Sequence, residues 1–247
     1  MHKYKMTIAY DGTAYHGWQI QKNKLSFQYT IENALKIILR DRTPITAAGR
    51  TDANVHAAGQ AAHFITSNKI NMNKTCYSLN CLLPKDIRIL KIEEVEMTFH
   101  ARYSAKAKIY RYYICKTDVQ DPFSRLYSYR PNKEIDLEIL KKSVSCFLGT
   151  HDFSSFANKQ NCGSAISKPV KTIYRIDVFE DENNIILEFE GNGFLYKMIR
   201  NIVGTLIDAA TKKIPIESIK KILLSKDRKK ASAPAPAHGL FLIEILY

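Results

Sequence analysis

The sequence has no run of about 18 consecutive apolar residues, the length that an α-helix needs to span a bilayer. Its opening stretch, MHKYKMTIAYDGTAY, carries charges where a signal peptide requires an unbroken apolar segment. Cysteines are few and odd in number, and they show neither the CxxC spacing of zinc sites nor a dense disulfide pattern. We therefore expect a cytoplasmic protein with free thiols at five positions: Cys76, Cys81, Cys115, Cys146 and Cys162.

Acidic residues are outnumbered, with 24 Asp and Glu against 37 Lys and Arg, which gives a formal net charge of +13. Such an excess favours a polyanionic partner such as nucleic acid, and it is spread along the chain rather than held in a basic tail. The composition, 45% hydrophobic and 25% charged over 247 residues, excludes disordered and collagen-like classes. The chain is long enough for one large or two modest domains.

The order of predicted elements indicates an α+β protein. Residues 1–105 read as a strand that ends at Asp11-Gly12, a helix over 30–41, two extended segments, a helix up to Pro84 and a strand over 87–96. This is a β-α-β-β-α-β order. A similar α+β set follows over residues 106–247, although no internal repeat is visible at residue level. Residues 225–239 combine a basic cluster with Ala-Pro repeats, which favours an extended surface connector whose cations could also touch phosphates.

Asp52 stands in an unusual stretch, AAGRTDANVHAAGQAAHF, which spans residues 47–64. An aspartate in a loop is usually a turn residue or a helix cap. Here small neighbours leave room for a large ligand to approach the backbone, and Arg50 supplies donors suited to phosphate or carboxylate. Asp52 is therefore a candidate catalytic residue on a loop beside strands, and Arg50 is a candidate substrate-binding residue.

Three polar residues that follow Asp52 suit supporting roles. Asn54 tolerates a positive φ, which a tight turn can require. His56 and His63 could act as acid or base near neutral pH, but neither belongs to an HExxH pattern or has a nucleophile in an identifiable elbow. We expect both histidines to be structural or to contact RNA.

Two further segments carry candidate residues. KIYRYYICK (residues 108–116) reads as a strand with Tyr110 and Tyr112 on one face and Arg111 on the other, a pattern that suits base stacking or ordinary cross-strand packing. NGFLYKMIRNIVGTLIDAA (residues 192–210) predicts a helix from about Phe194, with Arg200 at the border of its apolar stripe. An arginine there could extend to water or pair with a carboxylate from elsewhere. The stripe consists of Leu195, Met198, Ile199, Ile202, Val203 and Leu206.

The stretch GRTDANVHAAGQAAHF resembles the GRTDxGVHAxGQ signature of the tRNA pseudouridine synthase A family. Five other blocks resemble the family in the same order and cover the chain almost from end to end. They are YDGTAYHGWQIQ with TIENAL, FHARYSAKAKIYRYYI, HDFSSFAN, NGFLYKMIRNIVGTLID and GLFLIEILY.

The resemblance implies two α+β halves with mainly antiparallel sheets, joined around a central RNA-binding cleft, in a homodimer. It also implies a reaction without cofactor or metal: the isomerisation of uridine to pseudouridine in the anticodon arm of tRNA, at positions 38, 39 and 40. The bond from N1 to C1′ breaks, the uracil turns while still held, and C5 bonds to C1′.

The family's site residues map onto five positions of this sequence. Asp52 matches the essential aspartate, which either attacks the sugar or removes a proton from it. Arg200 matches the arginine that pairs with this aspartate and keeps it ionised. Tyr110 matches a tyrosine that stacks on the uracil and takes up the C5 proton. Arg50 suits a role in propping open the helix from which the base is flipped, and Leu240 resembles the apolar wall of the uracil pocket.

Two departures from the family pattern concern its fine contacts. Asn54 replaces a glycine, and Tyr196-Lys197 stands where relatives often carry histidine.

Three alternative functions stay open. The enzyme could modify ribosomal RNA, the chain could be an RNA-binding relative that has lost the chemistry, or a carboxylate pair could cleave the glycosidic bond, which would require a second acid near Asp52.

Overall fold

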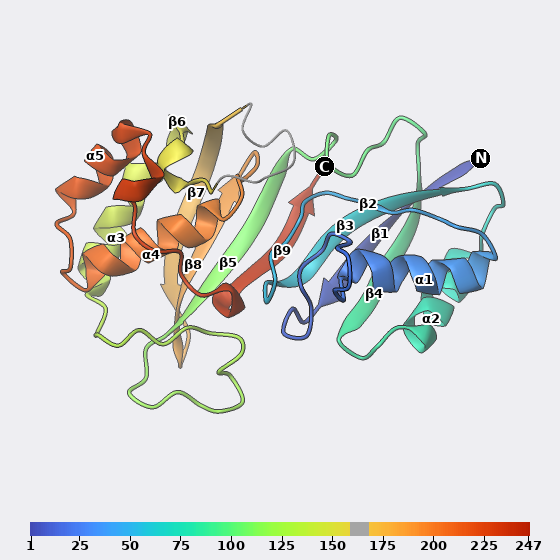
Figure 1. Ribbon diagram of the computed structural model, residues 1–247, viewed down its shortest axis with the longest axis horizontal. Helices are drawn as coiled ribbons and strands as arrows, with labels where there is room; N and C mark the ends of the chain where they lie inside the picture. The colour runs from blue at the N-terminus through green and yellow to red at the C-terminus, as the bar shows by residue number, and fades with distance from the viewer. Residues whose placement is uncertain (159–167) are drawn as a thin grey trace. The chain divides into compact units, whose positions relative to one another are not determined.

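The computed structural model describes residues 1–158 and 168–247, which form two compact units (Figure 1). Unit 1 comprises Met1–Lys106 and Phe241–Tyr247, and unit 2 comprises Ala107–Leu240. Four of the five cysteines are free thiols, as expected, and Cys162 lies outside the described residues. None of the described helices is both long and apolar enough to cross a membrane.

Unit 1 has the predicted β-α-β-β-α-β order and gains a last strand from the end of the chain. β1 is antiparallel to both β3 and β4, β2 pairs with one end of β3, and β9 lies parallel to the other end. The helices α1 and α2 pack against each other and α2 packs on β4. The elements are β1 (His2–Tyr10), α1 (Phe27–Leu39), β2 (Thr46–Ala47), β3 (His56–Thr66), α2 (Met72–Leu82), β4 (Ile87–Val95) and β9 (Leu240–Leu246).

The start of α1 shows how local chemistry sets an element's bounds. The helix begins three residues before the predicted segment because Ser26 caps it, its side-chain oxygen accepting from the backbone N–H of Tyr29. It ends where Arg40 takes a left-handed conformation, with φ of 57°. Ile31 and Leu35 are buried, as their spacing predicts.

The last strand belongs to unit 1, whereas the sequence analysis grouped it with the second half. β9 joins β3 through the parallel pairs His56 with Phe241 and Ala57 with Leu242. Gly59 makes this approach possible, since a Cβ there would lie 2.2 Å from the carbonyl oxygen of Ile243. The space beside Gly59, expected to admit a ligand, is therefore filled by β9.

Unit 2 is a second α+β assembly with an antiparallel sheet in the order β5-β8-β7-β6. With unit 1 it makes the fold α+β with mostly antiparallel strands, as predicted. The sequence analysis missed β6, which has only four residues, all at least partly exposed, and so lacks an apolar pattern. The elements are β5 (Ala107–Cys115), α3 (Leu137–Val144), β6 (Gly149–Asp152), β7 (Val170–Glu180), β8 (Asn184–Gly191), α4 (Met198–Ala210) and α5 (Glu217–Ser225).

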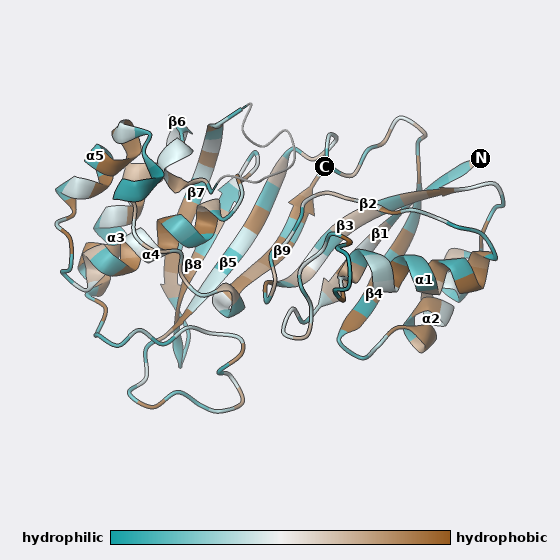
Figure 2. Ribbon diagram, viewed as in Figure 1, coloured by the Kyte–Doolittle hydropathy of each residue, from teal (hydrophilic) through white to brown (hydrophobic). Residues whose placement is uncertain are grey.

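The core of unit 2 lies between its sheet and the helices α3 and α4. Tyr110, Tyr112 and Ile114 alternate along β5 as buried residues. Figure 2 shows that hydrophobic and hydrophilic residues both occur along this strand. All six residues of the predicted apolar stripe are buried, and five of them lie on α4. The helix begins at Met198 rather than near Phe194, because Lys197 takes a left-handed conformation with φ of 60°.

Candidate active site

The Asp52 side chain lies on the loop between β2 and β3, as the sequence predicts, and is half-buried. The loop turns tightly, since the backbone N–H of Val55 donates to the carbonyl of Asp52 at 3.2 Å. Two bonds from the segment after β1 hold it: Trp18 N–H donates to the carbonyl of Thr51 at 3.1 Å, and Asn54 N–H donates to the carbonyl of Tyr15 at 3.4 Å. The backbone around Asp52 is thereby fixed from two sides.

Two glycines of the segment after β1 permit this contact. Gly17 has φ of 90°, and a Cβ there would lie 2.6 Å from the carbonyl oxygen of Thr51. Gly12 is similar, with a Cβ position 2.3 Å from the carbonyl oxygen of Val55. The sequence analysis did not single out these residues, although both belong to the YDGTAYHGWQIQ block. Because these glycines lack a Cβ, the segment after β1 can pack directly against the backbone of the loop that bears Asp52.

A buried set of hydrogen bonds fixes the other side of the loop. The hydroxyls of Tyr10 and Thr51 lie 2.8 Å apart, and the Gln60 amide donates to the carbonyl of Gly49 at 2.9 Å. Gln60 is fully buried and its amide also reaches the Tyr10 hydroxyl at 3.4 Å. Burial raises the pKa of Tyr10, so this hydroxyl stays protonated and can act as a donor.

Two residues that flank Asp52, Asn54 and Arg50, differ in their roles. Asn54 has φ of 63°, which confirms the prediction that this turn needs a left-handed residue. Arg50 is exposed on the same loop. One exposed cation and one half-buried carboxylate thus share a rigid turn, an arrangement suited to hold a polyanion beside a reacting group.

Both histidines of the stretch are structural, because their rings are almost completely buried. His56 Nδ1 accepts from the backbone N–H of Gly12 at 3.0 Å, and its ring stacks on Phe241 at 4.5 Å. His63 Nδ1 accepts from Ala101 N–H at 3.1 Å. Burial, with smaller effects from nearby His100 and Lys3, lowers the pKa of His63 to about 4. Neither ring is accessible to RNA.

Strand β5 separates its three candidate side chains as predicted. Tyr112 is fully buried and donates through its hydroxyl to the carbonyl of Pro236 at 2.9 Å, so it is a packing residue. Arg111 lies on the other face, where its Nε donates to Glu188 at 2.7 Å. Tyr110 is largely buried, and its ring meets Phe194 edge to face at 5.3 Å. Of the three, Tyr110 is the side chain that the family resemblance assigns to the substrate base.

Arg200 lies in the first turn of α4 and is half-buried at the border of the apolar stripe. Its Nε donates to the carbonyl of Ala235 at 2.8 Å. The nearby His238 was not singled out from the sequence; its pKa is lowered by burial and, to a smaller extent, by the charge of Arg200. Leu240 is buried at the start of β9.

The five predicted site residues divide between the two units. Arg50 and Asp52 share one loop of unit 1, whereas Tyr110, Arg200 and Leu240 belong to unit 2. Within unit 2, the residue before Leu240 packs against Tyr112, which lies two residues from Tyr110. Gly239 precedes Leu240, and a Cβ at Gly239 would lie 2.8 Å from the ring of Tyr112.

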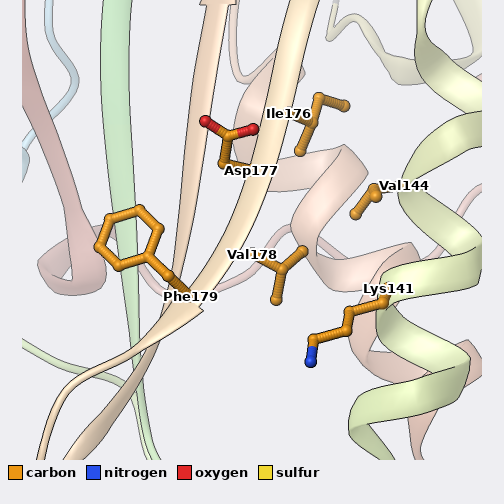
Figure 3. A pocket seen from close by; sticks show the side chains of 6 residues that line it. All are labelled: Lys141, Val144, Ile176, Asp177, Val178 and Phe179. Carbon is orange, nitrogen blue, oxygen red and sulfur yellow. The ribbon is translucent and has the colours of Figure 1, made fainter.

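A groove of about 470 Å³ in unit 2 contains none of these residues (Figure 3). It lies between α3 and β7, and its charged members are Lys141 and Asp177. Arg175 pairs with this aspartate. The carboxylate that lines the groove is therefore already paired. Over residues 1–158 and 168–247, no cluster of three or more His, Cys, Asp or Glu side chains is arranged to hold a metal ion.

The chain matches the model of one protein family, described as tRNA pseudouridine synthase, over residues 6–104 and 144–247. It is 52% identical to tRNA pseudouridine synthase A 1 of Protochlamydia amoebophila, covering all of this chain and 97% of that protein. It is 43% identical to tRNA pseudouridine synthase A of Acetivibrio thermocellus over the whole of both chains. The enzyme of that name from Chlamydia pneumoniae is also 43% identical, over all of this chain and 92% of its own.

Similarity to solved structures is weak. A chain of the archaeal box H/ACA sRNP Nop10-Cbf5 complex aligns with 97% of this chain at 11% identity and a TM-score of 0.34. The alignment covers 46% of that chain. A similarity this low supports no statement about function.

Proposed function

Because the chain belongs to the tRNA pseudouridine synthase family, we propose that it isomerises uridine to pseudouridine in tRNA, with Asp52 as the reacting carboxylate. The observation that carries this proposal is the fixed geometry of the loop that bears Asp52, within a sequence that matches the family over both units. A rigid support of this kind is what a catalytic group requires. The reaction is an intramolecular transfer, since no atom is gained or lost overall.

In the proposed reaction the ionised Asp52 attacks the sugar or removes a proton from it, and the N1–C1′ bond breaks. The uracil turns within the site and C5 bonds to C1′. On the first route this displaces Asp52 from the sugar, and on the second the proton taken by Asp52 returns to the sugar. The proton on C5 is then removed while N1 gains one. In this proposal Tyr110 stacks on the uracil and takes the C5 proton. Arg200 is the partner of Asp52, and Leu240 forms an apolar wall of the base pocket.

Arg50 acts on the RNA rather than on the reacting base. A uridine in a stem must leave its stack to be reached, and the exposed guanidinium of Arg50 suits a role in holding the helix open.

We also propose the finer assignments that the family resemblance implies: uridines 38, 39 and 40 of the anticodon arm as targets, a cytoplasmic homodimer as the working form, and no cofactor. The net charge of +13 supports a polyanionic substrate. Affinity for tRNA should therefore fall steeply with salt, and a flat response between about 50 and 200 mM would contradict the electrostatic argument.

The decisive variant is Asp52→Asn, tested with tRNA that carries tritium at C5 of uridine, so that each turnover releases label to water. We expect no release, with tRNA binding retained. Asp41→Asn, on an exposed loop, is the matched control and should react like the parent. Unchanged label release by the Asp52 variant would refute the mechanism, and free uracil as the product would point to glycosidic cleavage.

The targets are tested by mapping pseudouridines in the RNA of a deletion strain. Loss of modification at positions 38 to 40 of tRNA is the expected result. Loss confined to ribosomal RNA would refute the tRNA assignment. Binding of tRNA without any isomerisation by the parent protein would instead identify an RNA-binding relative without activity.

A further inference from the structure

A segment of unit 2, residues 228–236, lies along one side of α4, and we call it the strap. Its contacts fall on Arg200, Asn201, Gly204 and Thr205, which form one stripe of the helix. The sequence predicted a solvated surface connector here. Instead the strap is packed, with two of its alanines, Ala231 and Ala235, buried.

The C-terminal end of the strap holds Arg200 directly. The backbone N–H of Ala235 donates to the carbonyl of Arg200 at 2.9 Å, and Arg200 Nε donates in return to the carbonyl of Ala235 at 2.8 Å. These reciprocal bonds fix both the backbone and the direction of the guanidinium. The next residue, Pro236, accepts the hydroxyl of Tyr112, which lies two residues from Tyr110 on β5.

The middle of the strap lies against the backbone of α4. A Cβ on Gly204 would lie 2.0 Å from the carbonyl oxygen of Ala233, so only glycine allows this approach. One residue along, Ser232 N–H donates to Thr205 Oγ1 at 3.3 Å. The strap thus packs directly against the backbone of α4, so a displacement of the strap would also displace the helix.

Arg228 fastens the N-terminal end of the strap. Its guanidinium donates to Asn201 Oδ1 at 2.8 Å, to Asn158 Oδ1 at 3.3 Å and to the carbonyl of Ala231 at 2.9 Å. Asn201 is fully buried, and its amide donates to Phe156 and Asn158. These side chains are joined by hydrogen bonds, so removal of the Arg228 guanidinium leaves the buried Oδ1 of Asn201 without this donor.

We propose that Arg228 is a positioning residue for the isomerisation: it fastens the strap to α4, and through Ala235 the strap aims the Arg200 guanidinium. This inference rests on the proposed function, in which Arg200 pairs with Asp52. Its basis is geometric, since Arg200 and Asn201 are adjacent in α4 and are bonded to opposite ends of one segment.

The test compares Arg228→Gln with Lys221→Gln, which removes an exposed cation on α5 outside the strap. We expect kcat of Arg228→Gln to fall about 10- to 100-fold, the loss typical of a slightly misplaced catalytic group, with KM for tRNA within about twofold of the parent. Lys221→Gln should match the parent in kcat. Unfolding measured by circular dichroism must show that the assayed variant is folded.

A parent-like kcat in folded Arg228→Gln would overturn the inference. So would a loss of activity that follows only the unfolded fraction and disappears on cooling. If Arg228→Gln does not fold, Arg228→Lys keeps the charge but cannot reach three acceptors together, and its kcat must still fall. Should Asp52→Asn be inactive while Arg228→Gln is normal, the proposed function stands and only this inference fails. An active Asp52→Asn would instead refute the proposed mechanism.

Discussion

The hydroxyl of Tyr10, on the central strand β1, lies 2.8 Å from that of Thr51, the residue directly before Asp52. Both side chains are buried, and the Gln60 amide lies 3.4 Å from the Tyr10 hydroxyl. A strand of the sheet therefore holds the loop that bears Asp52 through a buried hydrogen bond. The position of Asp52 depends on the core of unit 1 as well as on the loop itself.

Tyr10→Phe removes this hydroxyl and changes little else. Because Thr51 and Gln60 lose a buried partner, we expect the free energy of unfolding to fall by about 1 to 3 kcal/mol, measured by urea denaturation. Pseudouridine formation should slow at saturating tRNA, since the loop becomes less fixed. Tyr29→Phe, with an exposed ring, is the control and should change neither quantity. Equal stability of the two variants would show that the buried bond contributes nothing.

The sequence predicted the elements of unit 1 well because their signals are local. The alternation of β1 and the spacing of Ile31 and Leu35 each reflect which side chains one element buries. The left-handed turn at Asn54 was equally readable, since few residues other than glycine adopt it without strain.

Contacts between segments distant in the chain could not be read in this way. Gly17 and Gly59 each lie against the backbone of a distant segment, which leaves no space for a side chain. The residues next to each glycine do not indicate which segment that is. The Ala-Pro pattern of the strap predicts extended backbone but not burial, because burial of Ala235 depends on its packing against α4. The family resemblance supplied Arg200 and Tyr110 as partners of Asp52, which composition and periodicity left open.

Gly17→Ala tests the close contact beneath Asp52. The new methyl group meets the carbonyl of Thr51 at 2.6 Å, and φ of 90° strains any side chain, so one backbone segment must move. We expect a loss of more than about 2 kcal/mol in unfolding free energy and a large loss of kcat. Gly193→Ala is the matched control, because a Cβ there meets no atom within 4 Å. Similar melting temperatures for the two variants would contradict the tight contact.

Asn54→Gly restores the residue typical of the family at a position with φ of 63°. Glycine adopts this conformation without strain, so unfolding free energy and kcat should each stay close to the parent, within about 0.5 kcal/mol in stability. Asn54→Val should cost about 1 to 2 kcal/mol, because a β-branched side chain is disfavoured there. Thermal unfolding of the three proteins measures the difference. If Asn54→Gly alone lost activity, the asparagine side chain would have a role beyond the turn.

His63 makes the stability of the protein depend on pH. Its pKa is lowered to about 4 in the folded state by burial and by the neighbouring His100 and Lys3, against about 6.5 when unfolded. Above about pH 6.5 neither state binds the proton, so stability is complete there. As pH falls from about 6.5 to 4 the unfolded state takes up the proton first, and stability falls by at most about 3 kcal/mol. His63→Asn, which keeps an acceptor for Ala101 N–H, should flatten this part of the curve of unfolding free energy against pH. The control His16→Asn, at an exposed position, should leave the slope unchanged, and a slope shared by all three proteins would show that His63 is not its source.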